Sequence, residues 1–488
     1  MQETKPPGRP QRARLVVPSR SDLLLKNFTE VIGGPLGARS APGLVSPGLF
    51  TVERVLIILT VLAALASLAV KGYCRTHGWQ TPDQFYSTCY SDFPEFFRDR
   101  GLGGDPFTFL SQGSLFEYPV LLGLIAGAAA WLIPGDGVTD SRILAYFDVN
   151  ATLITAVWIV TVLATARISR LRPWDAAMVA VAPGMVLAGT INWDLWAVGL
   201  VAVGMLCFAR ERLVLAGIFI GLAAATKPYA ALILAAIFLL AVRTGRIRVF
   251  LIAAGTATAA WLAVNAPVVA ANPTGWGYFL GSTQSREAGY GSVWFAYNLV
   301  ARRLRWQVLD PGVINVLAPA FFLLACAAVA FVALTAARRP RLAQLAFLLV
   351  AALILTNKVY SPQFVLWLIP LLALARPRWR DFLVWQGIEG LYWAAIWMFL
   401  AQVTSQGPTQ HNIDMPYYVL AVAAHVLVTA YLMVRVVWDI YDPNYDPVRR
   451  HHLDDPHGGP FNGLPDWLRF SPFRSSRAIL PWRARHHA

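Results

Sequence analysis

Charged residues are scarce in this chain of 488 residues, since Asp, Glu, Lys and Arg together make up only 14%. A soluble globular protein has about 25%, so the length does not divide into ordinary soluble domains. Disordered chains are poor in aromatic residues, whereas this one has 18 Trp, 26 Phe and 16 Tyr. Hydrophobic residues reach 57% and the mean hydropathy is +0.51. The composition therefore predicts an integral membrane protein.

Several sequence motifs are also missing. The chain has four cysteines and no CxxC pair, which argues against a disulfide scaffold or a Cys-based metal site. It lacks a Walker glycine-rich loop, GxGxxG and DxD, which disfavours enzymes that use ATP or nucleotide sugars. GxSxG and HExxH are absent as well, so the common serine-hydrolase and zinc-protease motifs do not apply.

Positive charge is in excess, with 41 Lys and Arg against 27 Asp and Glu and a net charge of +14. A soluble protein this basic would suggest a nucleic-acid partner. In a membrane protein, Lys and Arg instead concentrate in cytoplasmic loops. We therefore expect no nucleic-acid partner and use the basic residues to predict topology.

Thirteen apolar segments are long enough, or nearly so, to span a bilayer. The basic N-terminal segment is expected to be cytoplasmic. If segment 118–133 crossed the membrane, every later Arg cluster would lie outside, and this short segment also ends at Pro134. We therefore expect an all-α membrane protein with twelve spans, one juxtamembrane helix at 118–133 and both termini in the cytoplasm. The segments are about 55–71, 118–133, 143–166, 174–190, 193–209, 212–226, 228–242, 249–271, 314–337, 342–356, 362–375, 382–402 and 416–438.

These segments divide the chain into three parts. Residues 51–439 form the transmembrane domain. Residues 1–50 and 440–488 are rich in Pro and Arg, and we expect poorly packed cytoplasmic extensions there. The histidines of the C-terminal tail are expected to be solvated; they are His451, His452, His457, His486 and His487.

The predicted topology collects polar residues on the extracytoplasmic face. Lys227, Lys358 and Arg286 are cations near the membrane boundary, and a lipid phosphate is an anion at the same depth. Alternatively, each Lys only extends its ammonium group to the headgroups, although Pro228 fixes Lys227 in a turn. The other polar residues on this face are Asp92, Glu95, Glu117, Tyr118, Asn192, Asp194, Asn357, Tyr360, His411 and Asp414.

Asp92 lies in a run of aromatic residues shortly after the first span, within residues 90–97. A carboxylate near aromatic side chains and the membrane can have a raised pKa and act as a general base. The alternative is a solvated loop residue or a helix cap, with Pro94 inside the first turn.

Two acids and two cysteines have structural interpretations. Asp148 and Glu389 lie within apolar segments, so we expect them to face the bundle interior or a cavity, with Gln386 or an Arg as a partner for Glu389. Cys74 and Cys89 both lie in the first outer loop, where oxidation to a disulfide and the reduced pair are both open.

Motifs spread from about residue 90 to 370 resemble the actinobacterial members of glycosyltransferase family 87. Each motif is weak by itself, but the set is fairly specific. The motifs are Tyr90-Ser91-Asp92-Phe93-Pro94, Arg100-Gly101-Leu102, Asp105-Pro106-Phe107, Glu117-Tyr118-Pro119-Val120, the run 221–228 ending in Lys227-Pro228, Gly291-Ser292-Val293-Trp294 and the run 356–367 containing Asn357-Lys358-Val359-Tyr360.

The resemblance implies a GT-C fold, with the active site at the outer membrane face and juxtamembrane helices in the first outer loop. It implies a polyprenyl-phosphate sugar donor, typically mannose, and often an α-1,2 linkage. The catalytic carboxylate of the first loop corresponds to Asp92. Family members that act on phosphatidylinositol mannosides often have a His pair after the late Ser-Pro, but Ser361-Pro362 is followed here by Gln363.

We therefore expect a plasma-membrane glycosyltransferase that inverts the configuration at the anomeric carbon. Its acceptor is expected to be a lipid-linked glycan or another cell-envelope molecule. The donor phosphate would be bound by Lys227, Lys358 and Arg286. These cations can neutralise its charge, so no cofactor is required, although the sequence also allows a divalent metal ion. The alternatives are another donor sugar such as arabinofuranose, a lipid or solute transporter, or an assembly subunit. Candidates for binding the sugar or acceptor are Glu95, Glu117, Tyr118, Asn192, Asp194, Trp294 by stacking, Asn357, Tyr360 and His411.

Overall fold

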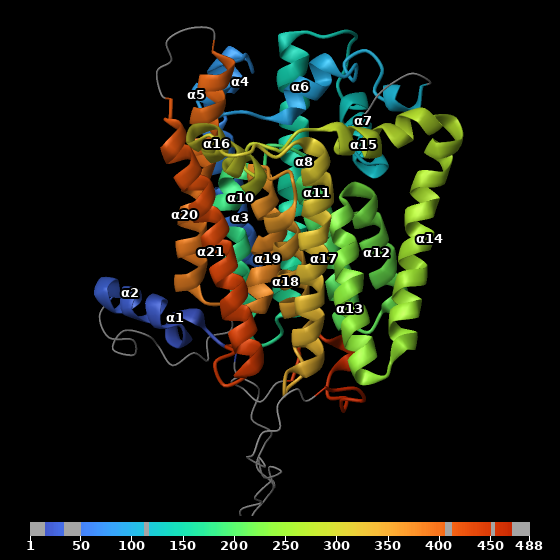
Figure 1. Cartoon of the computed structure of the whole chain (residues 1–488), viewed down its shortest axis with the longest axis vertical. Coiled ribbons are helices and arrows are strands. Elements are labelled where there is room, and N and C mark those ends of the chain that lie inside the picture. The colour runs from blue at the N-terminus through green and yellow to red at the C-terminus, as the bar shows by residue number, and fades with distance from the viewer. Residues whose placement is uncertain (1–14, 34–49, 112–116, 406–411, 450–453, 471–488) are drawn as a thin grey trace, which may run out of the picture.

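The computed structural model describes residues 15–33, 50–111, 117–405, 412–449 and 454–470, and the regular elements in these ranges are helices (Figure 1). Five described helices are long and apolar enough to cross a membrane: α3 (Val52–Val70), α8 (Asp140–Ile168), α14 (Ile247–Ala271), α17 (Pro311–Thr335) and α21 (Met415–Tyr441). The shorter apolar helices are α7 (Val120–Trp131), α11 (Asp194–Ala209), α12 (Leu213–Thr226), α13 (Ala231–Thr244), α18 (Leu342–Thr356) and α19 (Val365–Ala375). A further long helix, α20, spans Trp379–Thr404.

The bundle is apolar both inside and outside. Every residue of α19 is buried, which is expected of a helix that is hydrophobic on all faces and lies at the centre of a bundle. The outer helices α14 and α17 instead expose Leu251, Leu262, Leu323 and Leu324. Contiguous exposed leucines on long helices are unfavourable in water but favourable against lipid, so the packing agrees with a membrane protein.

The two ends of the bundle differ in structure (Figure 1). One end, which we call the site end, carries α4 (Gly72–His77), α5 (Asp83–Tyr86), α6 (Asp92–Asp99), α7, α15 (Pro273–Ser285) and α16 (Val293–Leu304). The opposite end, the tail end, carries α1 (Pro18–Ser21), α2 (Leu23–Gly33) and the C-terminal segment. Segment 118–133, for which we expected a juxtamembrane helix, contains α7, which has 12 residues.

Two segments differ from the helices expected from sequence. Segment 174–190 was expected to be one span but is broken into η2 (Pro173–Ala176), α9 (Ala177–Ala180) and α10 (Pro183–Ala188). The break falls at Pro183, which has no N–H to continue a helix. Residues 272–313 were expected to be a loop, yet they contain α15 and α16, both of which begin at side-chain caps from Asn272 and Ser292.

Described parts of both terminal extensions contact the rest of the protein. At the N-terminal side, Asp22 accepts a hydrogen bond from Trp379 N at 3.2 Å and so attaches α1 and α2 to α20. In the C-terminal segment, Asp446, Asp455 and His457 are buried rather than solvated. The other four tail histidines lie outside the described residues.

The burial of the C-terminal segment follows from the arginines at the tail end of the bundle. Arg341 donates from Nε to Asp446 Oδ2 at 2.7 Å and from Nη2 to Oδ1 at 3.0 Å, and both side chains are fully buried. Arg339 and Arg243 both bind Asp466. A guanidinium can be buried only if its charge and donors are satisfied, so these carboxylates hold the segment against the bundle.

Replacing Asp446 with Ala should therefore destabilise the protein by about 3–5 kcal/mol, because Arg341 would remain buried and unpaired. The measurement is chemical denaturation in detergent micelles. The matched control is Asp99→Ala, since the Arg98–Asp99 pair is part-exposed and should contribute about 0–1 kcal/mol. Equal losses for the two variants would contradict the structural role of the tail.

The two intramembrane acids lie in different surroundings. Asp148 does not face the interior as expected, because it pairs with Arg75 of α4 at 2.7 Å and its side chain is 41% exposed. Glu389 is buried in α20, as expected, but its partners are Tyr360 Oη at 2.9 Å and Trp385 Nε1 at 3.1 Å. Gln386, the expected partner, instead accepts a hydrogen bond from Gly184 N.

Candidate active site

Asp92 is the first residue of α6 and is fixed through its backbone. Ser91 caps the helix and donates to Thr190 O at 2.9 Å, while Asp92 N donates to Ile191 O at 2.7 Å. Phe93 and Phe97 are fully buried below the helix. The aromatic residues that flank Asp92 in the sequence therefore anchor a short amphipathic helix, and its first carboxylate points away from this apolar face.

The carboxylate of Asp92 is buried but not isolated. Its Oδ2 accepts a hydrogen bond from Tyr118 Oη at 2.7 Å, and the side chain is only 7% exposed. Burial raises the pKa of Asp92, and the hydrogen bonds from Tyr118 and Tyr90 and the charge of Lys227 oppose that rise. A carboxylate with a raised pKa that is still accessible from a cavity has the properties of a general base.

Lys227 forms a buried ion pair beside this carboxylate. Its Nζ lies 2.7 Å from Asp194 Oδ1 and 4.6 Å from the centre of the Tyr118 ring. Asp194 also accepts a hydrogen bond from Trp367 Nε1 at 2.9 Å. The pair forms because α12 ends at Thr226 and α11 begins at Asp194, so the two helix ends meet at the same level. Tyr118 therefore lies between a carboxylate and a cation.

Asn192 and Asp194 support the site without lining its cavity. Asn192 is fully buried, and its Nδ2 lies 3.4 Å from Tyr118 Oη. Its Oδ1 accepts a hydrogen bond from Asp194 N at 3.0 Å. In the structure these two residues, which the sequence suggested as sugar ligands, contact Tyr118 and Lys227.

A polar cavity of about 770 Å³ opens beside Asp92 at the site end. It is bordered by α5, α6, the segments 286–290 and 359–364, and part of α20. Seven residues predicted from sequence line it: Asp92, Glu95, Glu117, Tyr118, Lys227, Arg286 and Tyr360. The structure thus brings together side chains from segments that are up to about 270 residues apart in the chain.

Glu117 and Glu95 have cationic and hydroxyl partners in this cavity. Glu117 binds Arg100 Nη2 at 2.6 Å and lies 3.7 Å from Arg286 Nη2. Glu95 accepts a hydrogen bond from Tyr90 Oη at 3.1 Å, and burial together with the charge of Asp92 raises its pKa. Arg100 was not assigned a function from sequence, because nothing in its neighbourhood indicates that it meets Glu117.

Besides Asn192 and Asp194, three described residues that were predicted as ligands do not line this cavity. Lys358 donates to Gln284 O, Arg286 O and Asn315 Oδ1 at 2.6–3.0 Å, so its three donors are used by the protein. Trp294 was predicted to stack on a sugar, but it is buried and donates to Thr356 O at 3.0 Å. Asn357 is the C-terminal cap of α18 and does not line the cavity. His411 lies outside the described residues.

A second, apolar groove of about 440 Å³ meets the polar cavity at Tyr118, which lines both. Its walls come from α7, α12, α13, α14 and α15 and include Val120, Ile220, Ala224, Trp261 and Phe279. Gly221 permits this arrangement, since a Cβ atom there would lie 2.2 Å from Ala257 O of α14. The groove and the cavity together form a site with one apolar and one polar half.

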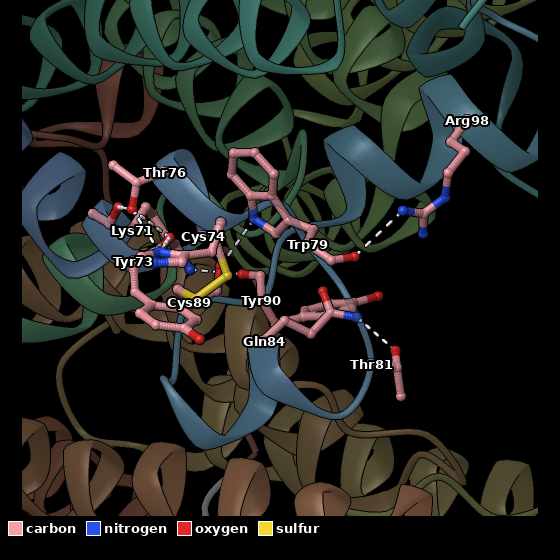
Figure 2. Close-up of a disulfide and its surroundings, with 12 residues drawn as sticks. Lys71, Tyr73, Cys74, Thr76, Trp79, Thr81, Gln84, Cys89, Tyr90 and Arg98 are labelled. Atoms are coloured by element: carbon pink, nitrogen blue, oxygen red, sulfur yellow. Dashed lines mark hydrogen bonds between the residues drawn. A yellow bond between two sulfur atoms is a disulfide. The ribbon is translucent and has the colours of Figure 1, made fainter. Parts of the chain in front are cut away.

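Cys74 and Cys89 form a disulfide in the first loop, so the open alternative is decided in favour of oxidation (Figure 2). The bond ties α4 to the segment that leads into α6. Among the described residues, no group of three or more His, Cys, Asp and Glu side chains is placed to hold a metal ion.

The chain is similar to known glycosyltransferases in structure and in sequence. The structure resembles the crystal structure of ArnT from Cupriavidus metallidurans bound to undecaprenyl phosphate, with a TM-score of 0.41, 13% identity and coverage of 82% of this chain and 78% of that one. It also resembles the apo oligosaccharyltransferase of Archaeoglobus fulgidus, with a TM-score of 0.34, 15% identity and coverage of 79% and 56%. A search of curated proteins finds no match. The sequence model of glycosyltransferase family 87 matches residues 116–362, just over half of the chain, and the protein therefore belongs to that family.

Proposed function

We propose that this family 87 enzyme transfers mannose from a polyprenyl-phosphate donor to a lipid-linked glycan, with Asp92 as the general base. The observation that carries the proposal is the position of Asp92, Tyr118 and Lys227 at the junction of the apolar groove and the polar cavity. A donor of this class has the same two halves, an isoprenoid chain and a charged sugar phosphate.

The apolar groove fits the donor lipid by its chemistry. Alkyl and aromatic side chains of five helices line it, and burying an isoprenoid chain there would stabilise the complex by about 0.8 kcal/mol per methylene. The chain would hold the headgroup at Tyr118, where binding energy from a remote part of the substrate orients the reacting atoms.

Lys227 is placed to stabilise the phosphate. An ammonium group has three donors, and Asp194 Oδ1 lies 2.7 Å from the Lys227 nitrogen as its ion-pair partner. Lys227 lines the polar cavity beside Tyr118, and a cation there favours the charge that develops on the leaving phosphate. Arg286, with a side chain that is 53% exposed at the cavity wall, is the second phosphate ligand that we propose. Lys358 has no such role in this proposal.

The proposed reaction is a single inverting displacement. The acceptor hydroxyl oxygen attacks the anomeric carbon, its proton passes to the carboxylate of Asp92, and the bond from the anomeric carbon to the phosphate oxygen breaks. The electron pair leaves on polyprenyl phosphate, which needs no protonation because it is a stable anion. Glu95 and Tyr360 line the same cavity and are the residues we propose for contacts to sugar or acceptor hydroxyls.

The same reasoning supports an extracytoplasmic site. The tail end of the bundle holds Arg243, Arg339, Arg341 and Arg376, and basic residues at helix ends favour the cytoplasm. The site end is the opposite one (Figure 1). We therefore propose a plasma-membrane enzyme with both termini in the cytoplasm and a GT-C fold.

The test is a transfer assay with purified protein in nanodiscs, using polyprenyl-phosphate mannose, polyprenyl-phosphate arabinofuranose and a lipid-glycan extract as acceptor. We expect a mannosylated lipid and release of polyprenyl phosphate. If only arabinofuranose were transferred, the donor sugar would be arabinofuranose and not mannose. Donor movement across the bilayer without transfer would favour the transporter instead.

A substitution that fills the apolar groove tests the donor site separately. Ala224→Phe should raise the KM for a long-chain donor about tenfold or more, because it displaces two or three methylenes, and should leave a short-chain donor unaffected. The matched control is Ala325→Phe, which makes the same change in a different apolar groove beside Trp294. Equal losses with long and short donors would argue against chain binding at this position.

A further inference from the structure

Lys71 is a fully buried cation that the proposed mechanism does not use. It lies between α3 and α4 and is 0% exposed. Its Nζ donates to Tyr90 O at 2.6 Å (Figure 2). Within the described ranges, no carboxylate lies within 4 Å of this nitrogen. Burying an ammonium group with a single hydrogen bond is unfavourable unless another group compensates its charge.

The hydrogen bond of Lys71 ends on the segment that delivers Asp92. Tyr90 is two residues before Asp92 in the chain, and Cys89 is joined to Cys74 by the disulfide. Trp79 Nε1 donates to Cys89 O at 3.1 Å. Lys71, Cys74 and Trp79 thus hold consecutive residues of one short segment, as Figure 2 shows.

We propose that Lys71 is a positioning residue for Asp92: it fixes the Tyr90 carbonyl, and its charge favours the ionised carboxylate. The inference rests on the proposed role of Asp92 as general base. Lys71 is not one of the residues that line the cavity, and its hydrogen bond reaches the lining residue Tyr90, so in this proposal it acts on the reaction through Asp92.

The electrostatics of the region agree with this coupling. Burial lowers the pKa of Lys71 to about 7, and the negative charge of Asp92 opposes that change. The interaction between two charges is reciprocal, so a charged Lys71 also lowers the pKa of Asp92. The other groups that act on Asp92 are Lys227 as a cation, Glu95 as a like charge, and Tyr90, Tyr118 and Asn192 as hydrogen-bond donors.

The coupling predicts how kcat/KM depends on pH on the acid side. Activity falls as pH drops through the raised pKa of Asp92, because a protonated carboxyl cannot accept a proton. As pH rises past about 7, Lys71 loses its charge while Asp92 stays ionised, so this coupling adds no alkaline limb. Since the two groups interact, the acid limb belongs to the pair.

The experiment compares pH profiles of wild type, Lys71→Met, Lys71→Gln and Lys71→Arg. In Lys71→Met and Lys71→Gln the positive charge is removed. The acid limb of their kcat/KM profiles should therefore move to higher pH by roughly one unit. Lys71→Arg keeps a charge at all relevant pH values, so its acid limb should stay at the wild-type position. The matched control is Arg75→Met, which removes a part-exposed cation four residues away and should also leave the acid limb in place.

An unshifted acid limb in both Met and Gln would overturn the proposal, because a purely structural Lys would change rate without changing the pH at which the base titrates. If Lys71→Met and Lys71→Gln fail to fold, an acid limb of Lys71→Arg that moves to higher pH also overturns it, because Arg keeps the charge. Infrared difference spectra of the Asp92 carboxyl, identified by its loss in Asp92→Asn, follow the same titration without turnover. That readout separates failure of this inference from failure of the proposed reaction.

Discussion

Replacing Asp92 with Asn is expected to lower kcat by about 10²–10⁴-fold and to leave donor binding close to wild type. The amide keeps nearly the shape of the carboxylate, so α6 and its cap from Ser91 should persist. An amide oxygen can still accept the hydrogen bond from Tyr118, but it cannot take the acceptor proton. The loss should therefore fall on the chemical step.

The measurement is steady-state transfer together with equilibrium binding of the donor. Asp83→Asn serves as the matched control, because it makes the same chemical change at an exposed residue of the same loop. A variant at Asp92 that keeps more than about a tenth of wild-type kcat would remove the general base from the mechanism. Loss of donor binding in step with kcat would assign Asp92 to binding instead.

Lys227→Met should have a comparably large effect, and it should combine two causes. Asp194 is fully buried, so removing its partner should destabilise the protein by about 3–5 kcal/mol. Removing a donor aimed at a developing anion should also lower kcat by about 10²–10³-fold. A single substitution cannot separate these contributions.

The double variant Lys227→Met/Asp194→Asn separates them. Its buried pair is neutral, and the Asn oxygen can still accept the hydrogen bond from Trp367, so most of the thermal stability should return. Turnover should stay low because the cation is missing. Recovery of kcat together with stability would show that Lys227 is structural, whereas Asp194→Asn alone retains the cation and is the matched control.

Several features of the site could be predicted from sequence because they are local. A helix start near Asp92, with Pro94 in the first turn, was one of the alternatives that the sequence offered, and the structure has α6 beginning at Asp92 with Ser91 as its cap. The pattern Thr226-Lys227-Pro228 predicts a fixed turn, and Lys227 is indeed the C-terminal cap of α12. The disulfide was one of two alternatives that the first loop allowed.

Other features depended on which helix ends meet. Lys358 and Lys227 follow similar apolar runs, yet Lys227 pairs with Asp194 beside Asp92, while Lys358 binds backbone oxygens of residues 284 and 286. Trp294 is a residue type that often stacks on sugars, but here its indole N–H donates a hydrogen bond to Thr356 O. Neither difference is visible in hydropathy, because both outcomes place the residue at the end of a helix.

The sequence by itself determined a helical membrane protein, a cluster of polar residues after the first apolar segment and the resemblance to glycosyltransferase family 87. Only the tertiary structure decided that Asp92, Tyr118 and Lys227 share one junction, that Lys71 is buried behind it and that the tail carboxylates cover the arginines of the bundle. The physical reason is that periodicity and composition report the environment of one segment at a time. Pairing of buried charges depends on contacts between segments, and each such pair forms only where packing brings opposite charges together.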